Sequence, residues 1–164
     1  MIADAIVYKS NTGHTRRYAE LLAKKINLPA YDLNEAVKLL SRGSSIIYLG
    51  WVRAGKIQGY KKAANQYHVV LVCSVGINDD ILASENIRKA TAISETIPIF
   101  NLKGGINRSM LKGINKFIIT MLEKGLSSAQ NKSDADAKML ELLKSTADFV
   151  SEENLEPVIN QYLD

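Results

Sequence analysis

The amino-acid sequence predicts an α/β fold built on a parallel β-sheet. Two observations carry this prediction: apolar runs of strand length recur through the first two-thirds of the 164-residue chain, and helix-length segments separate them. The runs are apolar on both faces, as expected for strands that helices cover from both sides. Because connections between parallel strands cross over with a right hand, few topologies remain, and a doubly wound five-stranded sheet is the simplest.

Five largely aliphatic runs predict the strands, and the second is weaker than the others and enters through Pro29. The predicted strands are Ile2–Tyr8, Ala30–Leu33, Ser45–Trp51, His68–Val75 and Ile97–Leu102.

Helix-length segments follow these runs. In the first of them, Tyr18, Leu22 and Ile26 fall on one stripe at helical spacing. The fourth opens with Asp79 and Asp80, and carboxylates in a first turn complement the helix dipole. The predicted helices are Gly13–Ile26, Asn34–Leu40, Gln58–Gln66, Asp79–Thr96 and Met110–Lys124.

Composition excludes several classes of protein. With 46% hydrophobic and 23% charged residues, the chain is not disordered throughout, and no apolar run reaches the roughly 18–20 residues that a membrane span needs. Cys73 is the single cysteine, which excludes an internal disulfide and is typical of a reducing cytosol. The N-terminal sequence lacks the pattern of a signal peptide. We therefore expect a cytoplasmic protein.

Charge is unevenly distributed along the chain. Residues 1–126 hold 18 basic and 9 acidic side chains, whereas residues 127–164 hold 3 basic and 8 acidic ones. The boundary falls in a stretch rich in Ser, Asn and Asp, Leu126–Asp136. We therefore expect a domain core over 1–126 and an acidic, helical C-terminal extension of the same domain over 127–164.

The sharpest motif follows the first predicted strand directly and reads Ser10-Asn11-Thr12-Gly13-His14-Thr15. A loop between a parallel strand and a helix presents unpaired N–H groups at the positive end of the helix dipole. Gly13 allows a tight turn, three hydroxyls add donors, and no carboxylate repels an anion. The loop lacks the glycine spacing of nucleotide-binding loops. It therefore predicts a phosphate site, and the alternative is an ordinary helix N-cap.

With its strand–loop–helix context, the Ser-x-Thr-Gly-x-Thr loop resembles the FMN-phosphate loop of flavodoxins and flavodoxin-like domains. The resemblance covers residues 2–125 in element order. It implies a flavodoxin-like three-layer fold, a five-stranded parallel sheet of order 2-1-3-4-5 with helices on both faces, and FMN at the switch point between strands one and three.

The same resemblance assigns two further loops to the isoalloxazine ring of FMN. The first comprises Trp51, Val52, Arg53, Ala54, Gly55 and Lys56. Within it Trp51 is the candidate for ring contact, and Gly50 and Gly55 are candidates for close backbone approach; the alternative makes Trp51 a core residue. The second loop, expected on the pyrimidine side, comprises Ser74, Val75 and Gly76, followed by Ile77 and Asn78.

Two segments resemble the subgroup of menaquinone-dependent protoporphyrinogen dehydrogenases. One is Tyr48–Lys56, and the other is Gly104-Gly105 with the apolar and basic helix Met110–Lys124. This resemblance implies an FMN-dependent oxidoreductase of an anionic small molecule, and a quinone or a membrane surface as a contact for the helix. The structural alternative makes that helix the fifth cover of the sheet.

Ten basic side chains fall near the predicted strand ends, which the implied fold places at the flavin edge. They are Lys9, Arg16, Arg17, Arg53, Lys56, Lys61, Lys62, Lys103, Arg108 and Lys112. Because positive charge favours a reduced, anionic flavin, we expect a less negative two-electron potential than in acidic flavodoxins. We also expect an acidic redox-partner protein or an anionic substrate, although the charges alternatively are only solvated. No recognition motif points to nucleic acid.

Other chemistry-bearing residues give weaker indications. His14 either contacts the phosphate or points to solvent, and we expect the latter. Cys73 is expected in the core. No metal-ligand spacing and no nucleophile–base pair is present in the sequence, as suits a protein whose cofactor carries the chemistry. Three functions stay open: an FMN electron carrier, an FMN-dependent oxidoreductase, and a flavin-free binding module.

Overall fold

The computed structural model describes residues 2–77, 81–106, 108–111, 113–128, 133–144 and 147–163. The chain divides into two compact units, which we call the sheet unit (Met1–Gly104 with Val150–Asp164) and the two-helix unit (Gly105–Phe149). Each is described by itself. The division at residue 126, which the charge distribution suggested, stays a prediction.

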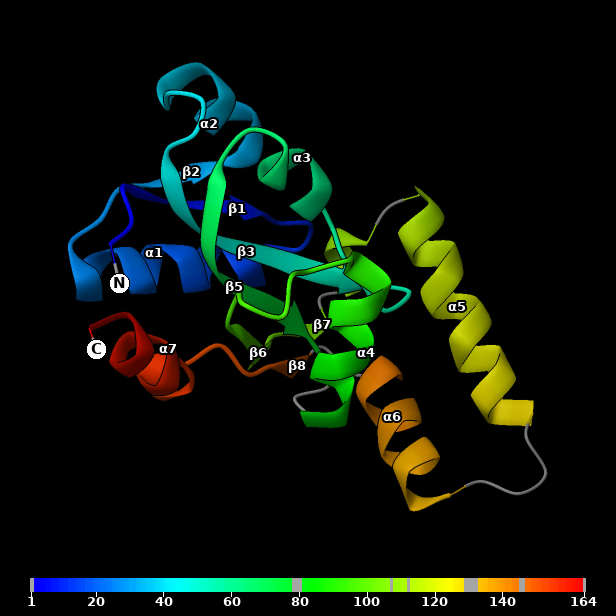
Figure 1. Ribbon diagram of the computed structural model, residues 1–164. Helices are drawn as coiled ribbons and strands as arrows, with labels where there is room; N and C mark the ends of the chain where they lie inside the picture. The colour runs from blue at the N-terminus through cyan, green and yellow to red at the C-terminus, as the bar shows by residue number, and fades with distance from the viewer. Residues whose placement is uncertain are drawn as a thin grey trace. The chain divides into compact units, whose positions relative to one another are not determined.

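A parallel sheet forms the centre of the sheet unit, and its strands run in the order β2-β1-β3-β5-β6 (Figure 1). The short β4 pairs antiparallel with the end of β3. Leaving β4 aside, this is the predicted order 2-1-3-4-5, so the predicted fold class is confirmed. The strands are β1 (Ala5–Lys9), β2 (Ala30–Asp32), β3 (Ser45–Arg53), β4 (Lys56–Ile57), β5 (His68–Gly76) and β6 (Ile99–Lys103).

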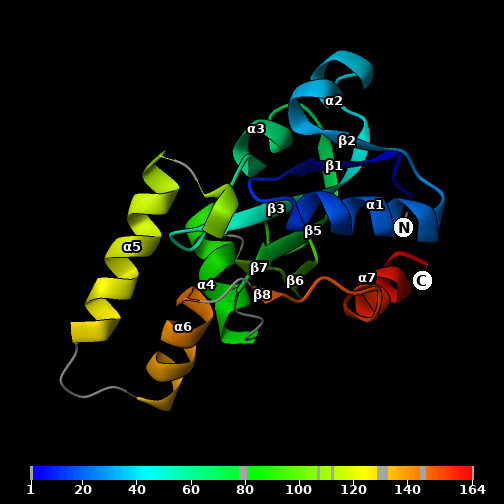
Figure 2. The same cartoon turned by 180° about the vertical axis from the view of Figure 1, so that it is seen from behind.

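Helices cover both faces of this sheet, as Figures 1 and 2 show. Neighbouring strand residues point to opposite faces, so Ile47 packs in one core cluster and Tyr48 in the other. The first cluster also holds residues of α1 and α7, and the second holds residues of α2, α3 and α4. The helices are α1 (His14–Ile26), α2 (Leu33–Leu39), α3 (Tyr60–Ala64), α4 (Ile81–Thr91) and α7 (Glu156–Leu163).

The acidic C-terminal segment docks on α1. Leu155, in the 3-10 turn η2 (Glu153–Leu155), and Val158 in α7 are fully buried in the first core cluster. The Tyr18 hydroxyl donates to the Lys103 carbonyl oxygen at 2.6 Å and accepts from the Asn154 side-chain amide at 2.6 Å. Apolar burial and hydrogen bonds thus hold residues 150–163 against α1 and the end of β6, within the sheet unit.

Helix α4 ends at Thr91, five residues earlier than predicted. Ala92 adopts a left-handed φ of 60°, and the Ile93 N–H donates to the Arg88 carbonyl oxygen at 3.0 Å, which closes the helix. The predicted first turn at Asp79 and Asp80 lies outside the described residues.

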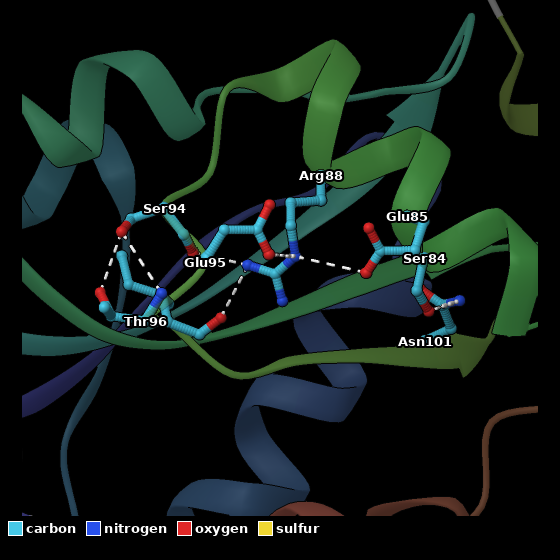
Figure 3. Close-up of polar contacts among 8 residues, drawn as sticks. Ser84, Glu85, Arg88, Ser94, Glu95, Thr96 and Asn101 are labelled. Carbon is cyan, nitrogen blue, oxygen red and sulfur yellow. Dashed lines mark hydrogen bonds and ion pairs between the residues drawn. The ribbon is translucent and has the colours of Figure 1, made fainter.

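Arg88 fastens the connection between α4 and β6 (Figure 3). Its side chain is buried, and Nη1 donates to the carbonyl oxygens of Ser94 at 2.5 Å and Ile97 at 3.0 Å. Nε lies 3.7 Å from a Glu85 oxygen and 3.8 Å from a Glu95 oxygen, but it makes no hydrogen bond to a described residue. A buried guanidinium therefore holds this loop together with the loop's own turn, in which Ile97 N–H donates to the Ser94 carbonyl oxygen at 3.1 Å.

The two-helix unit contains α5 and α6, which pack against each other, and an antiparallel pair of two-residue strands, β7 and β8. The Met110–Lys124 helix, expected as a cover of the sheet, is α5 and belongs to this second unit. The elements are β7 (Gly105–Ile106), the 3-10 turn η1 (Arg108–Met110), α5 (Gly113–Ser128), α6 (Asp134–Lys144) and β8 (Ala147–Asp148).

Candidate functional site

Strand register brings the three predicted segments to one edge of the sheet. Lys9, the last residue of β1, pairs with Gly50, and Gly50 pairs with Ser74. The loop after β1, the end of β3 and the end of β5 therefore share the carboxyl edge of the parallel strands. Strand β1 lies between β2 and β3, so connections diverge between β1 and β3. In open α/β sheets this switch point is where ligands bind.

The loop after β1 turns at Gly13, whose φ of 94° is left-handed. A Cβ at Gly13 would meet nothing within 4 Å, so the backbone conformation, and not crowding, favours glycine there. The Gly13 N–H donates to Ser10 Oγ at 3.2 Å, and helix α1 begins at the next residue. In the described first turn of α1 no residue is acidic. The first N–H groups of a helix lack partners within it.

Two side chains of this loop are buried. His14 is 8% exposed, and its Nδ1 lies 3.0 Å from Thr12 Oγ1. The expectation that His14 points to solvent is therefore wrong, because the ring is packed in the loop and contacts Thr12. Thr15 is buried as well, whereas Asn11 is exposed.

The segment predicted as a loop after the third strand is a β-hairpin. Arg53 pairs with Lys56 across a two-residue turn in which Ala54 (φ 49°) and Gly55 (φ 74°) are both left-handed, as in a type I′ turn. The alternative that buries Trp51 in the core is wrong, because Trp51 is only half-buried. The Arg53 guanidinium lies 5.9 Å from the centre of the Trp51 ring, a cation–π distance.

Gly50 serves the packing of this hairpin. A Cβ there would lie 2.3 Å from Ile57 Cγ2 and 2.9 Å from the Gln58 carbonyl oxygen. The buried Tyr48 hydroxyl donates to the same Gln58 oxygen at 2.7 Å, and burial raises the pKa of Tyr48. Sequence reasoning missed Tyr48 and Gln58. The apolar run shows that Tyr48 is buried but not which carbonyl its hydroxyl meets.

The end of β5 is joined to β6 and α4 by side-chain hydrogen bonds. The Ser74 hydroxyl donates to Asn101 Oδ1, and Asn101 Nδ2 donates to Ser84 Oγ at 2.7 Å. Ser74 and Val75 are buried, and the Gly76 carbonyl oxygen accepts from Gly104 N–H at 2.7 Å. The hydroxyl of Ser74 is thus committed within the sheet. Asn78 lies outside the described residues.

Two of the ten basic residues expected at the flavin edge lie beside acidic residues. Lys9 lies 3.9 Å from Asp32, and Arg16 lies 2.7 Å from Glu20. Neither carboxylate was predicted. Glu20 follows Arg16 by one helical turn, a spacing that the sequence does show, whereas Asp32 comes near Lys9 only through the pairing of β1 with β2. Nothing is described of the Arg108 side chain or of Lys112. The basic residues exposed in the sheet unit include Arg16, Arg17, Lys56, Lys61 and Lys62.

The described residues form neither a metal site nor a membrane-spanning helix. Within the described ranges, no group of His, Cys, Asp and Glu side chains could hold a metal ion. Among the helices that the structure describes, none has the length and apolar character needed to cross a membrane.

The fold and the edge where its loops converge define a doubly wound α/β domain with a candidate anion site at the switch point. The chain matches the model of the flavodoxin domain family over residues 5–134. Because the match spans most of the chain, the protein belongs to the flavodoxin domain family. No curated protein and no solved structure matches the chain.

A flavin is the cofactor that this family implies, and the loop after β1 fits its phosphate. Gly13 is left-handed with open space beside it, α1 begins at once, and the described first turn carries no acid. Oriented N–H groups of this kind form an anion-binding concavity. The half-buried Trp51 at the same edge offers an aromatic surface to a ring.

Proposed function

We propose that the protein binds FMN non-covalently and transfers electrons through it. The geometry of Ser10–Thr15 at the switch point carries this proposal, because it offers helix N-terminal N–H groups to a phosphate. Membership of the flavodoxin domain family supports it. Bound FMN would supply the redox chemistry.

The roles of the chain's own residues follow from their positions. The backbone and hydroxyls of Ser10–Thr15 would hold the phosphate, and Trp51 would contact the ring. The backbone of Val52–Lys56 and of Ser74–Gly76 would meet the ring's edges. The hydrogen bond between Thr12 Oγ1 and His14 Nδ1 would fix the loop before the ligand arrives.

The partner follows from charge. Arg16, Arg17, Lys56 and Lys61 are exposed in the sheet unit, so they would attract an acidic redox-partner protein or an anionic small substrate. We also infer a less negative potential than in acidic flavodoxins. A cytoplasmic location is part of the proposal and is supported by the single, buried Cys73.

The direct test is the visible spectrum of the purified protein, followed by release and quantitation of FMN. The variant Thr12→Asp places a carboxylate beside the phosphate and should weaken FMN binding by at least about a hundredfold, given the repulsion between close charges in a partly buried site. The control Thr12→Ser keeps the hydroxyl and should retain the flavin. Unchanged FMN affinity in Thr12→Asp would remove this loop from the site.

A second candidate is an FMN-dependent oxidoreductase of an anionic small substrate, which the exposed basic residues favour. Loss of flavin colour on adding such a donor, with no partner protein present, would support the enzyme. A need for a partner protein would support the carrier. If the purified protein is colourless and does not bind added FMN, the result would support a flavin-free binding module.

A further inference from the structure

Two hydroxyls of the loop after β1 make hydrogen bonds within the loop itself. Ser10 Oγ accepts from the Gly13 N–H at 3.2 Å, and Thr12 Oγ1 lies 3.0 Å from His14 Nδ1. A hydroxyl has one proton to donate and two lone pairs with which to accept. The direction of each bond therefore decides whether the hydroxyl can also donate its proton to a bound anion.

The bond of Ser10 has only one possible direction. A backbone N–H can donate but cannot accept, so the Ser10 oxygen is the acceptor. This bond does not use the proton of the Ser10 hydroxyl. Ser10 can therefore accept from Gly13 and donate to a phosphate at the same time.

The bond between Thr12 and His14 can run in either direction, because a histidine ring nitrogen accepts when it is bare and donates when it carries a proton. If Nδ1 is bare, the Thr12 hydroxyl donates its one proton to the ring. If Nδ1 carries a proton, the ring donates, and the Thr12 proton can be given to a ligand. The protonated nitrogen of His14 therefore decides what Thr12 can offer to a phosphate.

Packing holds His14 in place for this contact. The side chain is buried, and it lies against the end of β6, because a Cβ built at Gly104 would be 3.5 Å from His14 Cβ and 2.8 Å from Val75 Cγ1. The Gly104 N–H donates to the Gly76 carbonyl oxygen at 2.7 Å, which fixes the end of β6 beside β5. Close packing and the bond to Thr12 thus both restrict the ring.

We propose that His14 is a positioning residue for the cofactor phosphate. Its Nδ1–H donates to Thr12 Oγ1, so that the Thr12 hydroxyl proton is directed to the phosphate. The phosphate accepts hydrogen bonds through three oxygens, so a hydroxyl that faces it has to donate. His14 thus does for Thr12 what the Gly13 N–H does for Ser10. The inference rests on the proposed binding of FMN and adds the state of the histidine that this binding requires.

Nitrogen-15 NMR of the histidine rings in the FMN complex of the full-length protein tests the direction of the bond. The chain contains two histidines, His14 and His68, and His68 is exposed at the start of β5. The variant His68→Gln therefore assigns the signals. We expect Nδ1 of His14 to have the chemical shift and the N–H coupling of a protonated nitrogen. A bare Nδ1 in the complex would mean that Thr12 donates to the ring, and it overturns the proposal.

Affinities for FMN and for riboflavin, which lacks the phosphate, measure the consequence for binding. His14→Leu should lower the affinity for FMN at least about tenfold and leave that for riboflavin unchanged, because a hydrogen bond to a charged group is lost. His14→Asn, whose amide N–H can replace Nδ1–H, should recover most of the loss. The control His68→Gln should bind both flavins like the wild type. An unchanged FMN affinity in His14→Leu overturns the proposal.

A double-variant cycle with Thr12→Val separates this role from packing. Thr12→Val removes the hydroxyl through which His14 is proposed to act. In that background, His14→Leu should therefore change the affinity for FMN by less than about twofold. An equal loss with and without the Thr12 hydroxyl would mean that His14 only packs the loop, and it overturns the proposal.

Failure of the inference can be distinguished from failure of the proposed function. If the wild-type protein binds FMN no more tightly than riboflavin, the proposed phosphate site is wrong and the inference falls with it. If the wild type prefers FMN and His14→Leu keeps that preference, only the inference is wrong. Circular dichroism establishes that each variant is folded, and the NMR measurement uses the native His14, so it does not depend on the folding of His14→Leu.

Discussion

The two units use their apolar residues differently. In the sheet unit, Leu22, Leu49, Leu71 and Leu155 are fully buried. Among the side chains of the two-helix unit whose burial the structure describes, Ile106 and Leu143 are buried, whereas Met110, Phe117, Met121 and Leu122 are exposed. The sheet unit thus has a core of its own, whereas four large apolar side chains of the two-helix unit are exposed. Stability should therefore depend on the core of the sheet unit more than on these exposed side chains.

The contrast in charge between the two parts of the linear sequence is absent between the two units. Residues 1–104 with 150–164 hold 14 basic and 12 acidic side chains, and residues 105–149 hold 7 and 5. Each unit therefore carries a similar small positive excess, and the contrast along the linear sequence disappears. The reason is that the acidic C-terminal segment docks on α1, where Glu152 lies 2.6 Å from Lys25.

The largest expected effect tests this contrast in burial. Leu155→Ala should lower the free energy of unfolding by about 3 kcal/mol, because it opens a cavity in the core. Leu122→Ala, at an exposed position of α5, should change it by less than about 1 kcal/mol. Urea unfolding of the full-length variants measures both. Equal losses would mean that the two units do not differ as described.

Replacing Arg88 should give the next largest effect. Arg88→Met removes the guanidinium donor from the carbonyl oxygens of Ser94 and Ile97, of which, among the described residues, only the Ser94 oxygen keeps a second donor, the Ile97 N–H at 3.1 Å, and we expect a loss of about 2 kcal/mol. Glu95→Gln, which removes only an exposed partner 3.8 Å away, should cost less than about 1 kcal/mol. Urea unfolding distinguishes the two. A larger loss in Glu95→Gln would mean that the Arg88–Glu95 ion pair, and not the hydrogen bonds of Arg88, stabilises this connection.

The parallel strands could be predicted from the sequence, whereas the β3–β4 hairpin and the burial of His14 could not. The apolar runs predicted all five parallel strands, because burial on both faces leaves a local signature. The β3–β4 hairpin was not predicted, because its turn places Ala54 at a positive φ, which no propensity favours. The burial of His14 was missed because it depends on packing around the loop and on its contact with Thr12.

Alkaline pH should affect the sheet unit through Tyr48. Burial raises the pKa of Tyr48 above its ordinary value of 10.0, so the unfolded chain loses this proton first. Stability is therefore complete below pH 10.0 and falls as the pH rises above it. Tyr48→Phe should reduce this dependence, although it loses the hydrogen bond to Gln58. Urea unfolding at a series of alkaline pH values tests this. If the free energy of unfolding of Tyr48→Phe falls with pH as steeply as that of the wild type, another group causes the loss.

The smallest effect concerns the start of α6 in the two-helix unit. The Asp136 carboxylate accepts from Ser133 Oγ at 2.8 Å and from Ser133 N–H at 3.0 Å, as in a capping box. These bonds lower the pKa of Asp136 below 3.8, so their stabilisation is present above that pH and is lost as the pH falls through the lower folded value. An NMR titration of Asp136 checks this, and a pKa at or above 3.8 would contradict it.

The central claim is that the loop after β1 holds the phosphate of FMN. Titration of the flavin-free full-length protein with FMN and with riboflavin, which lacks the phosphate, tests it most directly. We expect FMN to bind at least about a hundredfold more tightly, since charge-assisted hydrogen bonds to the phosphate are among the strong ones. Thr12→Asp should abolish most of that preference. Equal affinities for FMN and riboflavin in the wild-type protein would contradict the claim.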